Sequence, residues 1–107
     1  TEENIAENPE TVAAVVDAML RGWDFYKDGY AEVNPFMQTF NEELTVESMN
    51  ATAEVQLDFI FGGDAASKGV GYMTMDRWVT LEKQLRDLGV LTEDIDLGAL
   101  FTGEFLK

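Results

Sequence analysis

The sequence contains no cysteine and no histidine, and it has few basic residues: 7 Lys and Arg against 21 Asp and Glu. The absence of cysteine excludes disulfide bonds, cysteine nucleophiles and zinc–thiolate sites. The absence of histidine excludes Ser–His–Asp triads, histidine general bases and imidazole metal ligands. We therefore expect a protein that is not an enzyme and that uses no metal and no cofactor.

The excess of acidic over basic residues argues against two classes of binding partner. The formal net charge is −14 at pH 7, whereas nucleic-acid binding requires clustered Lys and Arg. An anionic membrane surface would repel the chain for the same reason. No apolar run approaches the roughly 18 residues that span a bilayer. We expect no nucleic-acid partner and no membrane insertion.

Length and apolar spacing predict the fold class. A chain of 107 residues with 46% hydrophobic residues fits one globular domain, residues 1–107. The spacing of apolar residues fits helices and gives no good strand, which predicts an all-α protein of about five helices in a compact helical bundle. We expect helices over about residues 9–28, 30–41, 45–61 and 74–89, a loop over residues 62–73 and a last short segment opening at Thr92. Thr45 and Thr74 suit N-caps, and Gly89 suits the stop of the last long helix.

Capping residues, glycine and proline predict where the first two helices begin and end. Asn8 and Pro9 suit an N-cap and a first helical position. Asp28 and Gly29 suit a stop. Pro35 either starts the second helix or bends it. Gly22 lies inside the first helix, where we expect another backbone to approach it closely.

The segment 45–61 carries apolar residues on more than one side. Val55 and Phe59 lie apart from its main apolar stripe. That stripe consists of Val46, Met49, Ala53, Leu57 and Ile60. Together with the many aromatic residues, this pattern indicates more apolar surface than five short helices can cover among themselves. We therefore expect a missing partner, and we predict a two-fold homodimer of this chain, since closed symmetry is the usual solution.

Three other patterns favour ordinary structural roles. Residues 94–98 resemble a calcium loop, but Phe105 stands where an EF-hand needs a bidentate Glu. The glycine-rich residues 62–71 lack the spacing of a phosphate-binding loop. Glu54 and Asp58 share a helix face, yet pairs of this kind arise by chance among 21 acidic residues. We assign no metal site and no catalytic residue to them.

Three stretches, in this order, resemble a known family. They are residues 7–12 running on to 18–23, residues 69–71 with 76–78 and 85–91, and residues 96–106. They look like the C-terminal third of the periplasmic substrate-binding proteins of ABC importers. The closest type is the group that serves nitrate, sulfonate, taurine and thiamine-pyrimidine-like solutes. The resemblance covers residues 2–106.

The resemblance implies a function and a setting. Such proteins close two α/β lobes over a solute without chemistry, and the matching third is mostly helical and completes one lobe. The remainder of the lobes would lie outside this chain, which opens at Thr1, so we expect a fragment of a larger protein. It implies a periplasmic or extracellular location, an ABC permease as partner and a small-molecule solute. Trp23 and Tyr26 are the candidate solute contacts, with helix packing as their alternative role.

The residues alone are also compatible with a second function. A stand-alone helical module could use its apolar faces for protein–protein interaction or self-association, and it needs no missing lobes. A natural gene that started immediately before Thr1 would favour this alternative.

Overall fold

The structure is a computed structural model that describes residues 1–106, and within this range the chain is all-α with no strand. The expectation of an all-α fold with about five helices is confirmed for these residues. The elements are α1 (Glu2–Glu7), α2 (Pro9–Gln38), α3 (Val46–Phe61), α4 (Asp64–Lys68), α5 (Met75–Asp87) and the 3₁₀-helix η1 (Leu97–Ala99).

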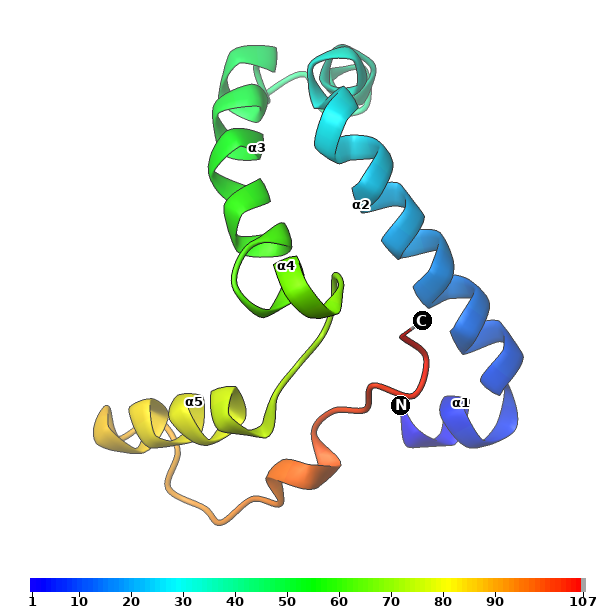
Figure 1. Cartoon of the computed structure of the whole chain (residues 1–107). Helices are drawn as coiled ribbons and strands as arrows, with labels where there is room; N and C mark the ends of the chain where they lie inside the picture. The colour runs from blue at the N-terminus through cyan, green and yellow to red at the C-terminus, as the bar shows by residue number, and fades with distance from the viewer. Residues whose placement is uncertain (107) are drawn as a thin grey trace.

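Helices α2 and α3 form an antiparallel hairpin (Figure 1), which we call the α2–α3 hairpin. Tyr30 pairs with Glu54 across it, and the ammonium of Lys27 lies 4.6 Å from the centre of the Phe61 ring. The predicted main apolar stripe of α3 is the side of this helix that faces α2. Every residue of that stripe is at least partly buried, and Ala53 is fully buried.

Helix α2 corrects two sequence expectations. The predicted stop at Asp28 and Gly29 is wrong, because the helix continues through both residues to Gln38. The predicted helices over residues 9–28 and 30–41 are therefore one element of 30 residues. Gly29 does not adopt a positive φ and has open space where a Cβ would stand. Its helix cost of about 1 kcal/mol is outweighed by the packing of later residues on α3.

Pro35 bends α2 rather than starting a new helix. Proline has no backbone N–H, so it cannot donate to the carbonyl one turn earlier, and its ring crowds that turn. Figure 1 shows the last turns of α2 end-on, at an angle to the rest of the helix. Gly22 has nothing within 4 Å of the Cβ position, so the expected close backbone approach is also wrong.

The second half of the chain departs from expectation in two places. The predicted loop over residues 62–73 contains α4, whose start follows Gly63 at φ +58°. The predicted helical segment at Thr92 does not form there. Only η1 forms, and Asp96 caps it by accepting a hydrogen bond from the N–H of Gly98 at 2.9 Å. Helix α5 keeps its predicted caps at Thr74 and Gly89.

The C-terminal tail closes the chain into a ring. It runs back towards α1 and α2 (Figure 1), where a side-chain carbon of Leu106 lies 3.1 Å from the position that a Cβ on Gly71 would occupy. Leu20 of α2 lies 3.8 Å from the same position. The ring is open in shape, with a Cα radius of gyration of 17.1 Å, against about 13 Å for a closely packed chain of this length.

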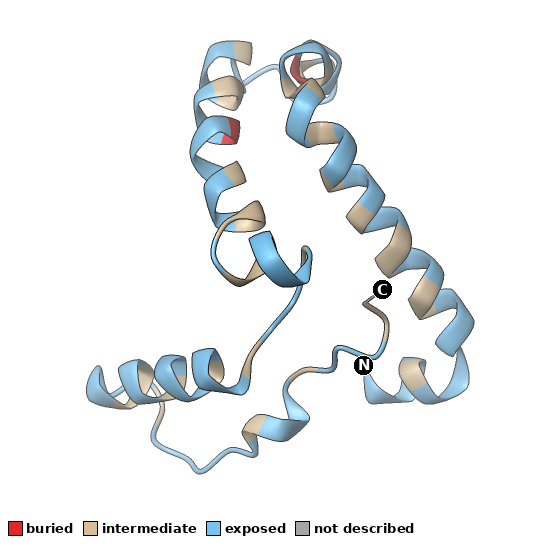
Figure 2. Ribbon diagram, in the orientation of Figure 1, coloured by how far each residue is buried: buried red, intermediate tan, exposed pale blue. Residues whose placement is uncertain are grey.

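Burial is concentrated in the hairpin. Of the described residues, only Asn34 and Ala53 are fully buried, and both lie where α2 meets α3 (Figure 2). Large apolar side chains are exposed on every helix from α2 to α5 except α4. The most exposed ones are Phe59 on α3, Phe40 after the end of α2 and Leu88 at the end of α5. Within the described residues, no helix is both long and apolar enough to cross a membrane.

Candidate functional site

A hydrogen-bonded relay of side chains organises the hairpin around Asn34. The hydroxyl of Tyr26 donates to Oδ1 of Asn34 at 2.8 Å, and Nδ2 of Asn34 donates to Oδ1 of Asn50 at 2.7 Å. A buried amide without partners would cost several kcal/mol, and here both ends of the amide are engaged. The relay therefore fixes the register of α2 against α3 and holds the ring of Tyr26 in place.

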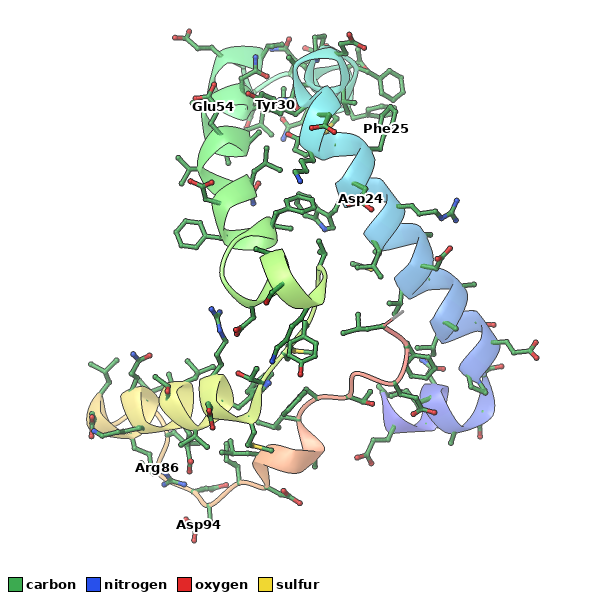
Figure 3. All side chains as sticks on the ribbon, in the orientation of Figure 1. Asp24, Phe25, Tyr30, Glu54, Arg86 and Asp94 are labelled. Atoms are coloured by element: carbon green, nitrogen blue, oxygen red, sulfur yellow. The ribbon has the colours of Figure 1, made fainter. Side chains whose placement is uncertain are left out.

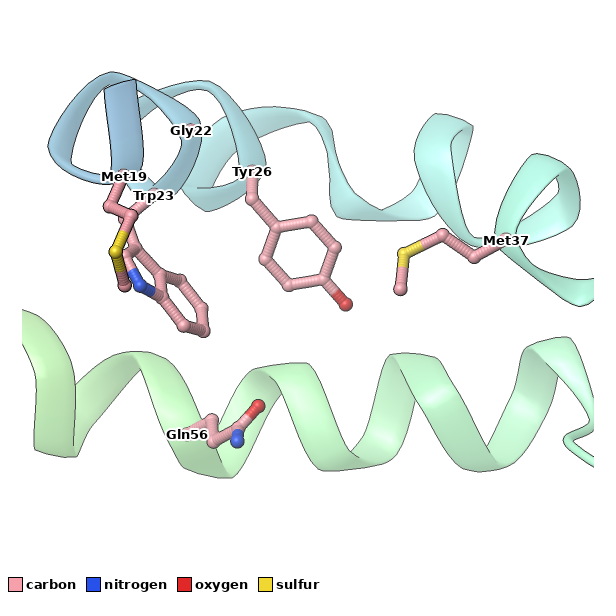
Figure 4. Close-up of a pocket in the computed structure, with 6 residues that line it drawn as sticks. All are labelled: Met19, Gly22, Trp23, Tyr26, Met37 and Gln56. Atoms are coloured by element: carbon pink, nitrogen blue, oxygen red, sulfur yellow. The ribbon is translucent and has the colours of Figure 1, made fainter. Parts of the chain in front are cut away.

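A groove of about 350 Å³ opens beside this relay, between α2 and α3 (Figure 4). Its lining residues are Met19, Gly22, Trp23, Tyr26, Met37 and Gln56. The α2 residues follow the spacing of one helix face, since positions 19, 22, 23 and 26 lie within two turns. In Figure 4 the side chains of Met19, Trp23 and Tyr26 extend from α2 toward α3, which contributes the amide of Gln56.

The structure brings the two sequence-predicted site residues together in this groove. The rings of Trp23 and Tyr26 meet edge to face, with centroids 5.9 Å apart. The hydroxyl of Tyr26 is already used in the relay, so the aromatic pair offers the groove an apolar wall. Solute contact by Trp23 and Tyr26 remains a prediction, and the packing role expected as the alternative is present in the same side chains.

The sequence reasoning missed the other members of the groove. Met37 comes from beyond the predicted break at Gly29, so it could not be placed on the same helix as Trp23. Gln56 lies on α3, next to the exposed residue Val55. The signal that was present is the four-residue spacing from Met19 to Trp23, which places both on one face.

A second groove lies on the exposed side of α3. It is lined by Ala51, Thr52, Val55, Gln56 and Phe59. Gln56 lines both grooves. No residue of either lining is charged, although 26% of the chain is Asp, Glu, Lys or Arg. We call the two linings together the charge-free face.

The acidic residues of α3 lie away from this face. Glu47, Glu54 and Asp58 are separated by seven and four residues, so they form one strip along the helix. Glu54 accepts a 3.4 Å hydrogen bond from the hydroxyl of Tyr30 (Figure 3). The exposed side of α3 is thus divided into an acidic strip and an uncharged apolar strip.

The patterns that resemble metal or phosphate sites have structural roles. Asp96 caps η1, and Asp94 contacts the guanidinium of Arg86 at 3.4 Å (Figure 3). In the glycine-rich region, Asp64 pairs with Arg77 at 3.0 Å. Within residues 1–106, no three acidic side chains lie close enough together to hold a metal ion. The linings of the two grooves offer apolar contact surface.

Comparison of the chain with protein-family models, with curated proteins and with solved structures finds no significant match. The resemblance to ABC-importer binding proteins therefore rests on the three sequence stretches themselves.

Proposed function

We propose that this chain is the non-catalytic C-terminal helical part of a substrate-binding protein of an ABC importer. In this proposal its exposed apolar surfaces pack on the rest of the same protein, and the complete molecule carries a small solute to an ABC permease from the periplasm or the cell exterior. The chain contributes to one lobe of the solute cleft and performs no chemistry on the solute.

The observation that carries this proposal is where the three resembling stretches lie. Leu20 belongs to the first stretch, Gly71 to the second and Leu106 to the third, and these residues converge at the closure of the ring. A second contact joins the second and third stretches, because Trp78 stacks on Phe101 with centroids 5.6 Å apart and planes 14° apart. Segments far apart in sequence thus supply the contacts that shape the chain, as we expect if the three stretches belong to one structural unit.

The open architecture also supports the proposal. The chain exposes 8234 Å², whereas a compact monomer of 12.0 kDa exposes about 6,000 Å² by the usual scaling. The difference of roughly 2,200 Å² comes with many exposed large apolar side chains. A sheet and further helices from the same protein would cover such surfaces.

Detection of the protein in its native cells tests this function. An antibody raised against the chain should recognise a band clearly heavier than 12.0 kDa, released with the periplasmic or extracellular fraction. The heavier protein, purified, should change its tryptophan fluorescence when nitrate, taurine or a pyrimidine solute is added, and Trp23→Phe should reduce that change. A 12.0 kDa band confined to the cytoplasm would contradict the proposal.

The charge-free face favours a second candidate, a stand-alone module for self-association. This alternative requires no further lobes, and the same immunoblot distinguishes it. A band at 12.0 kDa is its expected result.

A further inference from the structure

We infer that the C-terminal tail, residues 102–106, is a releasable clamp that holds the ring closed against the mutual repulsion of its two acidic sides. Low ionic strength opens the clamp, and screening by salt closes it. One side of the ring is α1 with α2, and the other is the C-terminal arm, residues 75–106 (Figure 1). The inference concerns the shape of the chain and does not depend on the solute-binding function.

The arm has few attachments to the rest of the chain. Within residues 1–106, α5 and η1 pack on each other, and neither packs on α1, α2, α3 or α4. Arg77 of α5 pairs with Asp64 of α4, but the Arg77 side chain is 70% exposed, and exposed pairs contribute little to stability. The arm is therefore held mainly at its two ends, by the linker of residues 69–74 and by the tail.

Leu106 makes the contact between the tail and the hairpin. One of its side-chain carbons lies 3.1 Å from the position that a Cβ on Gly71 would occupy, and a side-chain carbon of Leu20 lies 3.8 Å from that position. Gly71 has φ +83° and no side chain, so Leu106 can approach the backbone of the linker there. The N–H of Leu106 donates to the carbonyl of Gly103 at 3.1 Å, which forms a turn at the end of the tail. One partly buried leucine thus joins tail, linker and α2, and a contact of this size is small enough to release.

Acidic residues outnumber basic ones on both sides of the ring. Residues 2–38, which include α1 and α2, contain 8 acidic and 2 basic residues, and residues 75–107 contain 7 acidic and 4 basic residues. Glu2 of α1 and Glu104 of the tail line one hollow of about 620 Å³ from its two sides. Like charges placed in this way repel each other and favour an open ring.

Salt acts differently on the two opposing effects. Repulsion between exposed charges reaches about 30 Å at 0.01 M salt and about 8 Å at 0.15 M salt. The apolar contact of Leu106 carries no charge, so screening does not weaken it. The hairpin depends on the buried relay through Asn34, so we expect salt to change the closure of the ring and to leave the hairpin folded.

Energy transfer between two dyes measures the opening within single chains. The chain has no cysteine, so Ala14→Cys in α2 and Thr80→Cys in α5 place one label on each side of the ring. Nanomolar protein keeps the chains apart, since weak complexes dissociate at micromolar concentrations. The transfer efficiency should fall when NaCl is lowered from about 0.15 M to about 0.01 M, and it should recover when the salt is restored.

Three substitutions without charge locate the clamp. Leu106→Asn removes the apolar contact and should give a low transfer efficiency at both salt concentrations. Leu20→Asn should have the same effect, and the double variant should open no further than either single variant, because both remove one shared contact. Leu88→Asn is the matched control, since Leu88 is 75% exposed at the end of α5, and it should keep the salt response of the wild type.

Three results would overturn the inference. The first is a wild-type transfer efficiency that does not change with salt. The second is wild-type behaviour of Leu106→Asn while its circular dichroism stays helical. The third is a fall in transfer at low salt that comes with a loss of helical circular dichroism, because the clamp is expected to release without unfolding the hairpin. None of these results bears on the size or location of the protein in cells.

Discussion

The α2–α3 hairpin and the C-terminal arm, residues 75–106, are held together by different means. The hairpin contains both fully buried residues and the relay from Tyr26 through Asn34 to Asn50. The arm contains no fully buried residue, and the contact of η1 with α5 depends on the stacking of Trp78 and Phe101. Its ion pairs are partly or largely exposed, and such pairs contribute about 1 kcal/mol or less.

The difference indicates which half can form by itself. Buried polar pairs specify one register, because any shift leaves a buried amide without its partner. The stacked pair Trp78 and Phe101 is only partly buried and has no polar partners that fix one geometry, so it tolerates rearrangement. We therefore expect the hairpin to be the stable unit and the arm to open locally, unless another polypeptide covers its apolar side chains.

The largest expected effect is on the hairpin. Asn34→Ala removes the buried amide and leaves the hydroxyl of Tyr26 and Oδ1 of Asn50 without their partner. We expect a loss of about 2–3 kcal/mol in the free energy of unfolding, measured by urea denaturation with circular dichroism. Glu42→Ala is the control, because Glu42 is exposed in the α2–α3 connection and its side chain has no hydrogen-bond partner there, and it should cost under about 0.5 kcal/mol. Equal effects of the two variants would remove the distinction between buried relay and surface.

The next effect is on the arm. Phe101→Ala removes the stacking partner of Trp78, and we expect a loss of about 1–2 kcal/mol, confined to residues 75–106. Amide hydrogen exchange should become faster in the arm and stay unchanged in the hairpin. Faster exchange in both regions would show that they unfold as one unit.

An effect of similar size, but confined to the last turn of the helix, is expected at the end of α5. Gly89 adopts φ +70°, its N–H donates to the carbonyl of Arg86, and the N–H of Val90 donates to that of Leu85. These bonds form a Schellman cap, which needs a left-handed residue. Gly89→Ala should destabilise the arm by about 1–2 kcal/mol, while Gly103→Ala, with open space and no positive φ, serves as the control. Hydrogen exchange at the last turn of α5 provides the measurement.

The smallest expected change in stability is at Gly29, and its sign distinguishes a continuous α2 from a helix that ends there. Gly29 lies inside α2 with nothing within 4 Å of its Cβ position, so Gly29→Ala should stabilise the hairpin by about 1 kcal/mol. If the helix ended at Gly29 in a left-handed conformation, as the sequence alone suggested, the same substitution would destabilise it. Thermal unfolding of the variant decides between the two structures of this segment.

Part of the candidate site could be predicted from the sequence. The spacing placed Trp23 and Tyr26 on one face of a helix, and the structure places both in the groove. Gln56 and Met37 could not be predicted, because their positions depend on how α2 bends and on the register of α3. The buried, hydrogen-bonded role of Asn34 could not be predicted, since an asparagine before a proline ordinarily indicates a helix boundary.

The sequence by itself determined the all-α class, the caps of α3 and α5 at Thr45, Thr74 and Gly89, and the residues of the main apolar stripe of α3. Caps and amphipathic stripes are local, because their hydrogen bonds and spacings span three or four residues. Only the tertiary structure decided that α2 continues through Gly29 and Pro35. Contacts of Tyr30 and Asn34 with α3 stabilise that continuation, and they join residues 16 or more positions apart, beyond the reach of any local pattern.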